Sequence, residues 1–307
     1  MIQSGAPWED GDRLLPARAK AGHKGTFGTV AIVGGSVGHG RVMVGAPALV
    51  ALGALRSGAG LAKILASRQA LAQSLAMCPS ATGVSIEADE AGGLDMANAI
   101  SVLDSQIAGA DALVIGPGMG VGEVERAMSL RAVQQDSVPV VVDADAITNL
   151  ADIPELWRDF RAAAILTPHP GEFARIAKVL RISHSAVEKD QRPQAAAALA
   201  QRLGCVVVLK GAGTVVSDGL RTWVCARGHA CLATAGTGDV LSGVIAGLLA
   251  QHTRAGMTLF DTARFAVEAH ARAGEAWAQA AGAQAGLLAP ELSTHLPVAL
   301  EAFRAGG

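Results

Sequence analysis

The stretch TAGTGDVLSGVIAGLLAQ, Thr234–Gln251, places a glycine-rich turn directly before one acid, Asp239, and twelve residues without a charge. Glycines let the backbone turn so that several N–H groups point into one space. A helix that begins at such a turn adds the positive end of its dipole, which attracts anions. The stretch therefore predicts an anion hole for a phosphate group, formed by Ala235, Gly236, Thr237 and Gly238.

Asp239 stands at the mouth of this predicted anion hole. It would be a poor phosphate ligand because like charges repel. It suits instead a base that takes the proton of a hydroxyl group attacking the phosphate. A structural alternative is that Thr237 or Asp239 caps the helix. The apolar helix behind the turn and the polar clusters elsewhere in the chain favour the catalytic interpretation.

Short β-branched runs alternate with alanine-rich helical stretches along the chain. Strands are expected at residues 29–35, 61–67, 112–118, 138–145, 163–169 and 205–211. Helices are expected between them at residues 45–60, 123–135, 172–180 and 192–204. Strands that read as continuous hydrophobic runs and are separated by helices indicate a mostly parallel sheet covered on both faces.

The chain after the last of these strands has a different pattern. GTVVSDGLRTWVC, residues 213–225, contains two strand-like runs around Asp218-Gly219, a dipeptide suited to a tight hairpin turn. The C-terminal third is expected to be helical at residues 238–251, 259–279 and 290–303. The predicted fold class is thus an α/β/α sandwich with a small antiparallel hairpin.

Composition and charge narrow the class of protein. Half of the 307 residues are hydrophobic and the net charge is −2, which argues against nucleic acid or membrane partners held by bulk electrostatics. No secretory signal or membrane-length apolar run occurs. Buried free thiols in a reducing cytoplasm are expected for Cys78, Cys205, Cys225 and Cys231. We expect an N-terminal arm, residues 1–20, and a single domain, residues 21–307.

Polar clusters follow several of the predicted strands, where ligands of open α/β sheets bind. LKGAGT ends a strand with a glycine turn and Lys210, which indicates either a nucleotide-binding loop or an ordinary strand turn. The chain contains no Walker A pattern and no G-x-G-x-x-G spacing.

Two further clusters leave alternatives open. TPHPGE places His169 and Glu172 three apart in a loop fixed by prolines, and a metal pair there rests on weak evidence. In VVDADAITNL, Asp143 and Asp145 follow a buried strand. One of them contacts magnesium or a substrate hydroxyl, or simply caps the next helix.

Seven segments together resemble the ADP/ATP-dependent NAD(P)H-hydrate dehydratases of the ribokinase-like superfamily. They are HKGTFGTVAIVGGS, GAPALVALGALRSGAGL, DALVIGPGMG, VVDADAITNL, ILTPHPGEF, VVLKGAGTVV and ATAGTGDVLSGVIAGLLAQ. The resemblance runs in order from about His23 to near the C-terminus. TAGTGDVLSG indicates ribokinase-like kinases broadly, and TPHPGE with GPGMG narrows the resemblance to the dehydratases.

The resemblance implies roles for individual residues. Substrate contacts are implied for Ala46, Gly118, His169 and the catalytic Asp239. Nucleotide contacts are implied for Lys210, Gly211, Ala212, Gly213, Thr214 and Gly238. Two departures bear on nucleotide affinity: His229 stands where relatives usually carry Asn, and Ala235 where a second glycine is commoner. The metal ligands are unknown.

The implied reaction is repair of hydrated NAD(P)H, in which ring-hydroxyl phosphorylation and loss of phosphate restore NAD(P)H. The resemblance further implies the S epimer as substrate, ADP rather than ATP as donor, Mg²⁺ on the phosphates, and a cytoplasmic homo-oligomer, tetrameric in many relatives. Because the HKG motif begins near residue 20, we expect the epimerase to be a separate protein. The rival functions are a vitamin or sugar kinase on the same fold and a nucleotide sensor without turnover.

Overall fold

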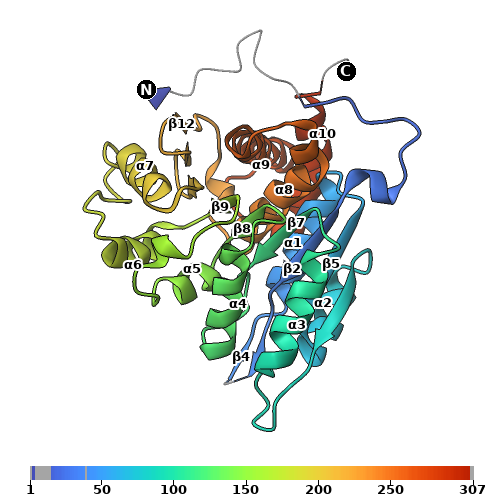
Figure 1. Cartoon of the computed structure of the whole chain (residues 1–307). Helices are drawn as coiled ribbons and strands as arrows, with labels where there is room; N and C mark the ends of the chain where they lie inside the picture. Colours follow the sequence, from blue (N-terminus) through green and yellow to red (C-terminus); the bar gives the residue numbers. More distant parts are fainter. Residues whose placement is uncertain (1, 4–14, 39, 305–307) are drawn as a thin grey trace.

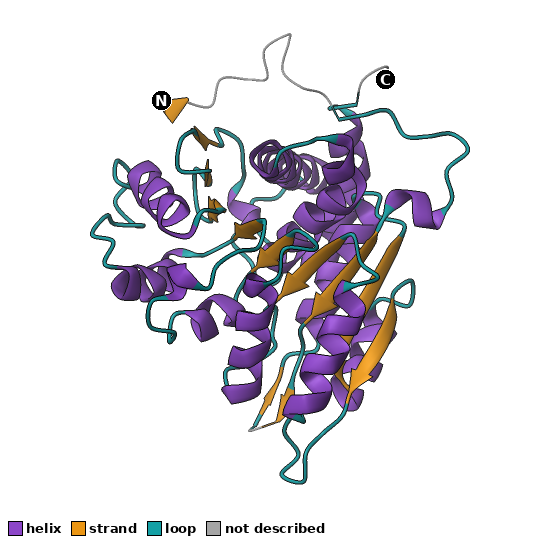
Figure 2. Ribbon diagram, in the orientation of Figure 1, coloured by secondary structure: helices purple, strands orange, loops and turns teal. Residues whose placement is uncertain are grey.

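A ten-stranded sheet, in the order β1-β12-β11-β10-β9-β8-β7-β2-β5-β6, forms the centre of the molecule (Figures 1 and 2). The computed structural model describes residues 2–3, 15–38 and 40–304. From β10 to β6 along this order, each strand runs parallel to the next. These strands are β2 (Thr29–Val33), β5 (Leu61–Ser67), β6 (Thr82–Ile86), β7 (Ala112–Ile115), β8 (Val140–Val142), β9 (Ala164–Leu166) and β10 (Val206–Leu209).

The antiparallel hairpin predicted from the sequence is confirmed. Strand β11 (Val215–Ser217) pairs antiparallel with both β10 and β12 (Thr222–Val224). The turn between β11 and β12 contains Gly219 at φ 86°, a conformation that favours glycine. Strand β1 (Ile2–Gln3) pairs with β12, and β3 (Val37–Gly38) and β4 (Arg41–Val42) form a separate two-stranded sheet.

Helices cover both faces of the sheet (Figure 1), which confirms the expected three-layer architecture. One face carries α1 (Gly45–Arg56), α2 (Arg68–Met77), α8 (Thr237–His252), α9 (Leu259–Ala281) and α10 (Ala289–Glu301). The other carries α3 (Met96–Ile107), α4 (Glu123–Gln134), α5 (Asp145–Leu150), α6 (Pro170–Leu180) and α7 (Arg192–Leu203). Short 3-10 turns are η1 (Lys24–Phe27), η2 (Leu156–Arg158), η3 (Ala230–Leu232) and η4 (Thr253–Ala255).

The alternation of side chains along β2 explains why its sequence is hydrophobic throughout. Val30 and Ile32 join the core under α1 and α8, while Ala31 and Val33 join the core on the opposite face. A strand buried on both faces has no polar side to show in its pattern. The same holds for the other central strands.

Two glycines let α8 pack closely against α1. A Cβ atom at Gly243 would collide with the carbonyl oxygen of Val50, and one at Gly247 would collide with Ser57. All residues from Val240 to Ala250 are buried. The close packing of α8 against α1 fixes the position of the helix start, where Asp239 lies.

The strand order changes direction at β2, which lies between β5 and β7. Ligands of open α/β sheets bind at the carboxyl ends of strands beside such a point. There the backbone N–H of Gly35, after β2, donates to the carbonyl of Pro117, after β7, at 2.9 Å. The polar clusters predicted from the sequence follow β7, β8, β9 and β10 along the same edge.

Most of the expected N-terminal arm lies outside the described residues. Leu15, where the described chain resumes, is buried and its N–H donates to the carbonyl of Phe303 at 2.8 Å. Within the described part of the chain, no helix is both long and apolar enough to span a membrane. The four cysteines are all buried free thiols, as predicted.

Candidate active site

The predicted anion hole lies at the start of α8. Gly236 is the N-cap residue in a left-handed conformation, at φ 89°, and no side chain caps the helix. The hydroxyl of Thr237 points instead to the carbonyls of Leu232 (2.9 Å) and Thr234 (3.0 Å), which closes the turn. Neither Thr237 nor Asp239 is therefore a helix cap. The first N–H groups of α8 remain open to an anion.

Asp239 lies in the first turn of α8 with an altered acidity. Burial, reinforced by the negative charge of Asp143 and opposed by Lys210, raises its pKa to about 7. Within the described chain its carboxylate has no hydrogen-bond or ion-pair partner. A carboxylate with a pKa near neutrality is suited to take a proton during a reaction.

Lys210, at the end of β10, is bound to Asp143, at the end of β8. Lys210 Nζ lies 2.7 Å from Asp143 Oδ1, and Ser242 Oγ donates to Asp143 Oδ2 at 2.6 Å. These partners hold the pKa of Asp143 below its usual range although burial alone would raise it. Burial alone would lower the pKa of Lys210, but Asp143 and Glu172 outweigh it and the pKa is raised. Both groups are charged at neutral pH.

The DADA loop separates its two aspartates through a strained residue. Ala144 has φ 49° and ψ −121°, a region that non-glycine residues rarely occupy. Asp143 turns toward Lys210, whereas Asp145 accepts a hydrogen bond from the N–H of Gly120 at 2.9 Å. Asn149 donates to the carbonyl of Gly120 at 3.0 Å. The loop after β8 is thereby tied to the GPGMG loop after β7.

His169 and Glu172 form a reciprocal cap at the start of α6. His169 Nδ1 accepts from the N–H groups of Gly171 (2.9 Å) and Glu172 (3.3 Å), and Glu172 accepts from the N–H of His169 at 2.7 Å. Because Nδ1 accepts, the proton of the neutral ring is on Nε2, which lies 3.2 Å from Glu172 Oε1; neither nitrogen offers a free lone pair, which argues against the metal-pair alternative. Burial and Lys210 lower the pKa of His169. Burial raises the pKa of Glu172 to about 7 despite Lys210.

Ala46 and Gly118, the other two predicted substrate residues, lie side by side. Gly118 has φ 64°, and a Cβ atom placed on it would be 3.2 Å from Cβ of Ala46 and 2.8 Å from the carbonyl oxygen of Met43. A side chain larger than hydrogen at Gly118 would therefore close the space at the start of α1.

The KGAGT turn is held by Arg192, a buried residue of α7 that sequence reasoning did not single out. Its guanidinium donates to the carbonyls of Leu209 (3.0 Å) and Lys210 (3.2 Å). The turn itself uses two glycines at positive φ, Gly211 and Gly213. Thr214 closes it by donating to the carbonyl of Gly211 at 2.9 Å, while Ala212 is exposed.

The KGAGT turn and the anion hole meet. A Cβ atom on Gly238 would lie 3.5 Å from Lys210 Nζ. Lys210, the first residue of the turn predicted to bind the nucleotide, therefore lies beside the predicted anion hole at the start of α8.

The two departures noted in the sequence keep the local geometry. His229 caps η3, with Nδ1 accepting from the N–H of Cys231 at 3.2 Å, as the side-chain oxygen of Asn would. Ala235 is not in the left-handed region, which Gly236 occupies instead. A glycine at position 235 is therefore not required by the backbone.

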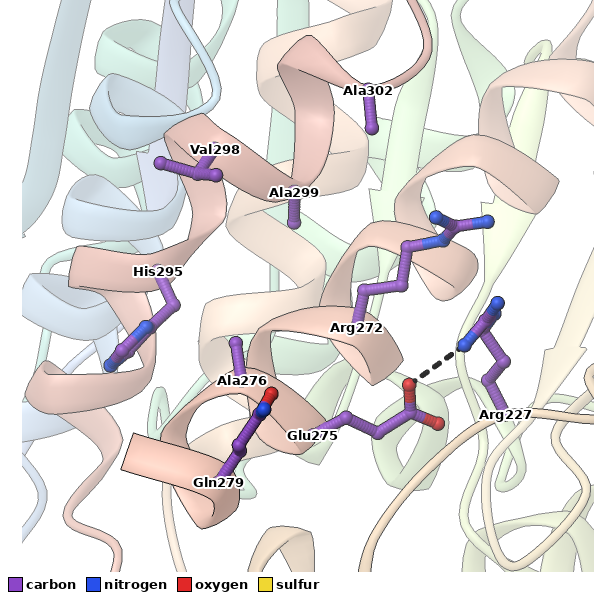
Figure 3. A pocket seen from close by; sticks show the side chains of 9 residues that line it. All are labelled: Arg227, Arg272, Glu275, Ala276, Gln279, His295, Val298, Ala299 and Ala302. Atoms are coloured by element: carbon purple, nitrogen blue, oxygen red, sulfur yellow. Dashed lines mark hydrogen bonds and ion pairs between the residues drawn. The ribbon is translucent and has the colours of Figure 1, made fainter. Parts of the chain in front are cut away.

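A separate cavity of about 370 Å³ lies between α9, α10 and the loop that carries Arg227 (Figure 3). Arg227 and Glu275 on its wall form an ion pair of 3.0 Å. None of the predicted site residues lines it. The cavity is therefore distinct from the site at the start of α8.

The chain is similar to known proteins over most of its length. Residues 30–298 match the family model described as NAD(P)H-hydrate dehydratase. The ADP-dependent (S)-NAD(P)H-hydrate dehydratase of Neisseria meningitidis serogroup B is 37% identical over 91% of this chain and 87% of that protein. The bifunctional NAD(P)H-hydrate repair enzyme of Coxiella burnetii is 35% identical over 95% of this chain. The chain spans about half of that relative's length, 54%.

Solved structures agree on the fold. The ADP/ATP-dependent NAD(P)H-hydrate dehydratase of Bacillus subtilis, co-crystallised with ATP/Mg²⁺, aligns with a TM-score of 0.75 and 31% identity over 94% of this chain and 95% of that one. A ribokinase from Cryptococcus neoformans aligns with a TM-score of 0.54 over 89% of this chain and 99% of that one. At 15% identity the ribokinase shows the fold alone, which is ribokinase-like as predicted. By its matched family model and its relatives, this chain belongs to the NAD(P)H-hydrate dehydratase family.

Proposed function

We propose that this chain catalyses the nucleotide-dependent dehydration of hydrated NAD(P)H, which restores NAD(P)H and so repairs the nicotinamide nucleotide. The observation that carries the proposal is Asp239, with a pKa of about 7, at the uncapped start of α8. An amide-lined anion hole beside a neutral-pH base fits phosphoryl transfer to a hydroxyl group.

The chemical problem is the leaving group. Hydrated NAD(P)H carries a ring hydroxyl, and hydroxide leaves poorly. Asp239 takes the hydroxyl proton while the oxygen attacks the terminal phosphoryl group of the nucleotide. The bond between that phosphorus and the nucleotide's bridging oxygen breaks. The ring nitrogen then expels phosphate, and loss of a proton from the neighbouring ring carbon restores the double bond. With ADP as donor the products are NAD(P)H, AMP and phosphate.

The open N–H groups of α8 supply the electrostatic part of this mechanism. Charge grows on the transferred phosphoryl group, and fixed donors aimed at it stabilise the transition state more than the bound nucleotide. In this proposal Gly236, Thr237 and Gly238 line that space with Ala235. Lys210 adds a positive charge beside Gly238, and the KGAGT turn holds the nucleotide.

The roles proposed for the substrate residues are supported by two observations: Ala46 and Gly118 lie side by side, and the Glu172 that forms a cap with His169 is close enough to Asp239 to raise its pKa. Ala46 and Gly118 would leave room for the ring, and His169 would position it. The S epimer and ADP as donor are supported by the name of the Neisseria meningitidis relative, an ADP-dependent (S)-NAD(P)H-hydrate dehydratase.

Magnesium is the proposed partner of the nucleotide phosphates, supported by the ATP/Mg²⁺ co-crystal of the Bacillus subtilis protein. No group of three His, Cys, Asp or Glu side chains in the described part of the chain is arranged to hold a metal. Mg²⁺ on phosphates needs only one or two protein carboxylates. Asp143 has both oxygens engaged, so Asp145 is the aspartate of the loop that fits. Bound Mg²⁺ would neutralise charge on the phosphates.

The proposal also covers the extent of the domain, the location of the protein and its self-association. We infer one domain over residues 21–307 and a cytoplasmic location, which the buried free thiols support. Self-association as a homo-oligomer, including a tetramer, is supported by exposed apolar side chains near the start of α1, at Val42, Met43 and Met77.

The test is to incubate the protein with NADHX, Mg²⁺ and either ADP or ATP, and to follow both NADH absorbance and free phosphate. We expect NADH and phosphate in equal amounts, only when nucleotide is present. A stable phosphorylated small molecule would indicate a kinase, and nucleotide binding without any turnover would indicate a sensor. Conversion at the same rate without nucleotide would contradict the proposed mechanism.

A further inference from the structure

His270 of α9 contacts the first turn of α8. Its Nε2 atom lies 2.9 Å from the carbonyl oxygen of Thr237. A carbonyl oxygen only accepts hydrogen bonds, so Nε2 carries the proton and donates it. Burial and the charge of Lys210 lower the pKa of His270 to about 4, so the ring is neutral at neutral pH. His270 is therefore a fixed hydrogen-bond donor and not a proton carrier.

The carbonyl of Thr237 and the N–H of Gly238 belong to the same peptide unit. In a trans peptide these two groups point in opposite directions. The carbonyl points toward His270, so the N–H of Gly238 points to the open space before α8, where no side chain caps the helix. The helix itself orients this peptide, and the hydrogen bond from His270 on another helix reinforces that orientation from behind the anion hole.

The same hydrogen bond also affects the strength of the Gly238 donor. The Thr237 carbonyl lies in the first turn of α8, where it is placed to accept from the helix backbone as well. A second donor withdraws electron density from the peptide and makes its N–H a stronger donor, because hydrogen bonds in a chain polarise one another. On its other side the turn is held by the Thr237 hydroxyl, so this peptide has little freedom to rotate.

We propose that His270 is a positioning residue for phosphoryl transfer, which holds and polarises the Thr237–Gly238 peptide so that the Gly238 N–H faces the transferred group. This inference rests on the proposed function. Charge on that group grows toward the transition state, so the contribution falls on kcat rather than on substrate binding.

The first arm of the experiment is kinetic. His270→Phe keeps a ring and removes the donor; loss of a whole oxyanion donor costs about 10² to 10³ in kcat, so we expect a smaller fall of about tenfold to hundredfold. The KM for NADHX should stay within about twofold. His270→Gln places an amide N–H near the position of Nε2 and should recover kcat to within about threefold of wild type.

A matched control lies at the opposite end of the 16-residue α8. His252 is also buried with a pKa lowered to about 4, and its Nε2 has no partner within the described chain. His252→Phe makes the same chemical change about 20 Å away. It should leave kcat unchanged, which separates the proposed role from the general cost of altering a buried histidine.

The second arm needs no substrate. In ¹⁵N-glycine-labelled protein, the Gly238 amide resonance is identified by its loss in Gly238→Ala. We expect His270→Phe to shift this resonance upfield and His270→Gln to return it. If wild type fails to convert NADHX, the proposed function is wrong, yet this shift still tests the contact between His270 and the peptide.

An unchanged Gly238 resonance, or an unchanged kcat in a folded His270→Phe protein that converts NADHX in its wild-type form, would overturn the inference. Should the phenylalanine variant not fold, His270→Asn serves in its place, because its amide is one bond too short to reach the Thr237 carbonyl. A fall in kcat that His270→Gln does not recover would mean that His270 acts only through packing.

Discussion

Lys210 Nζ lies 2.7 Å from Asp143 Oδ1, while Ser242 donates to the other oxygen of the same carboxylate at 2.6 Å. Lys210 is therefore committed to Asp143 and does not form an ion pair with Asp239. Asp239 keeps a raised pKa of about 7 because burial and neighbouring carboxylates outweigh the more distant lysine. Asp143, paired with Lys210, thus stays ionised throughout. Asp239, which has no such partner, has a pKa near neutrality and can exchange a proton.

The Lys210–Asp143 pair should be strongly coupled in stability. Asp143 is 1% exposed, so Lys210→Met leaves a buried charge without its partner and should lower the free energy of unfolding by about 3–5 kcal/mol. Adding Asp143→Asn removes that charge and should recover much of the loss. Urea denaturation of the two single variants and the double variant measures the coupling. Losses that simply add would show that the pair is not coupled.

Substitution of two glycines of α8 by alanine should have different effects: one should lower stability and the other activity. At Gly243 a Cβ atom collides with the Val50 carbonyl, so Gly243→Ala should separate α1 from α8 and cost about 3 kcal/mol of stability. At Gly238 the nearest atom is Lys210 Nζ at 3.5 Å, an ordinary contact. Gly238→Ala should therefore fold normally but lower kcat/KM for the nucleotide at least tenfold. Thermal melting and steady-state kinetics distinguish them; a stable Gly243→Ala protein would refute the packing argument.

His169 should combine a structural with a substrate role. His169→Ala removes the cap of α6 and should cost about 1 kcal/mol of stability, whereas His169→Asn retains a capping acceptor and should not. Both should raise the KM for NADHX more than they lower kcat, because a positioning contact is similar in ground and transition states. A thousandfold fall in kcat at unchanged KM would instead make His169 a participant in the chemistry.

Asp239 should make stability depend on pH. Its pKa rises from 3.8 to about 7 on folding, so the folded protein holds this proton more tightly than the unfolded chain. The resulting destabilisation is absent below about pH 4, grows up to pH 7 and is complete above it. Asp239→Asn should thus be more stable than wild type at pH 8 by about 1–3 kcal/mol, given its partial exposure, and equal to it near pH 4. Urea unfolding at both values measures this; an equal difference at both would contradict the raised pKa.

The parallel strands that were predicted correctly are mostly buried on both faces, and such a strand reads as a short continuous hydrophobic run. The hairpin strands β11 and β12 were predicted from the turn between them. Strand β6, Thr82–Ile86, was missed since it is an edge strand, paired only with β5 and largely uncovered, so TGVSI shows no such run. Helices α2 and α3, on either side of it, were missed with it.

The sequence predicted those residues of the candidate site that directly follow a strand. Asp143, His169 and Lys210 each follow a strand, and parallel strands end at the same edge of the sheet. His270 and Arg192 were not found because they act on backbone carbonyls from helices distant in sequence, which leaves no motif. The cap formed by His169 has no signal in the sequence, because histidine is not among the residues that usually cap helices.

The most direct test of the central claim is the turnover of Asp239→Asn. The change is nearly isosteric, and no side-chain hydrogen bond of Asp239 is lost within the described residues. We expect NADHX turnover to fall by about 10² to 10⁴, since an amide cannot take the hydroxyl proton. ADP affinity, measured by calorimetry, should hold or rise slightly because a negative charge near the phosphates is removed. Turnover within about threefold of wild type would contradict the assignment of Asp239 as the base.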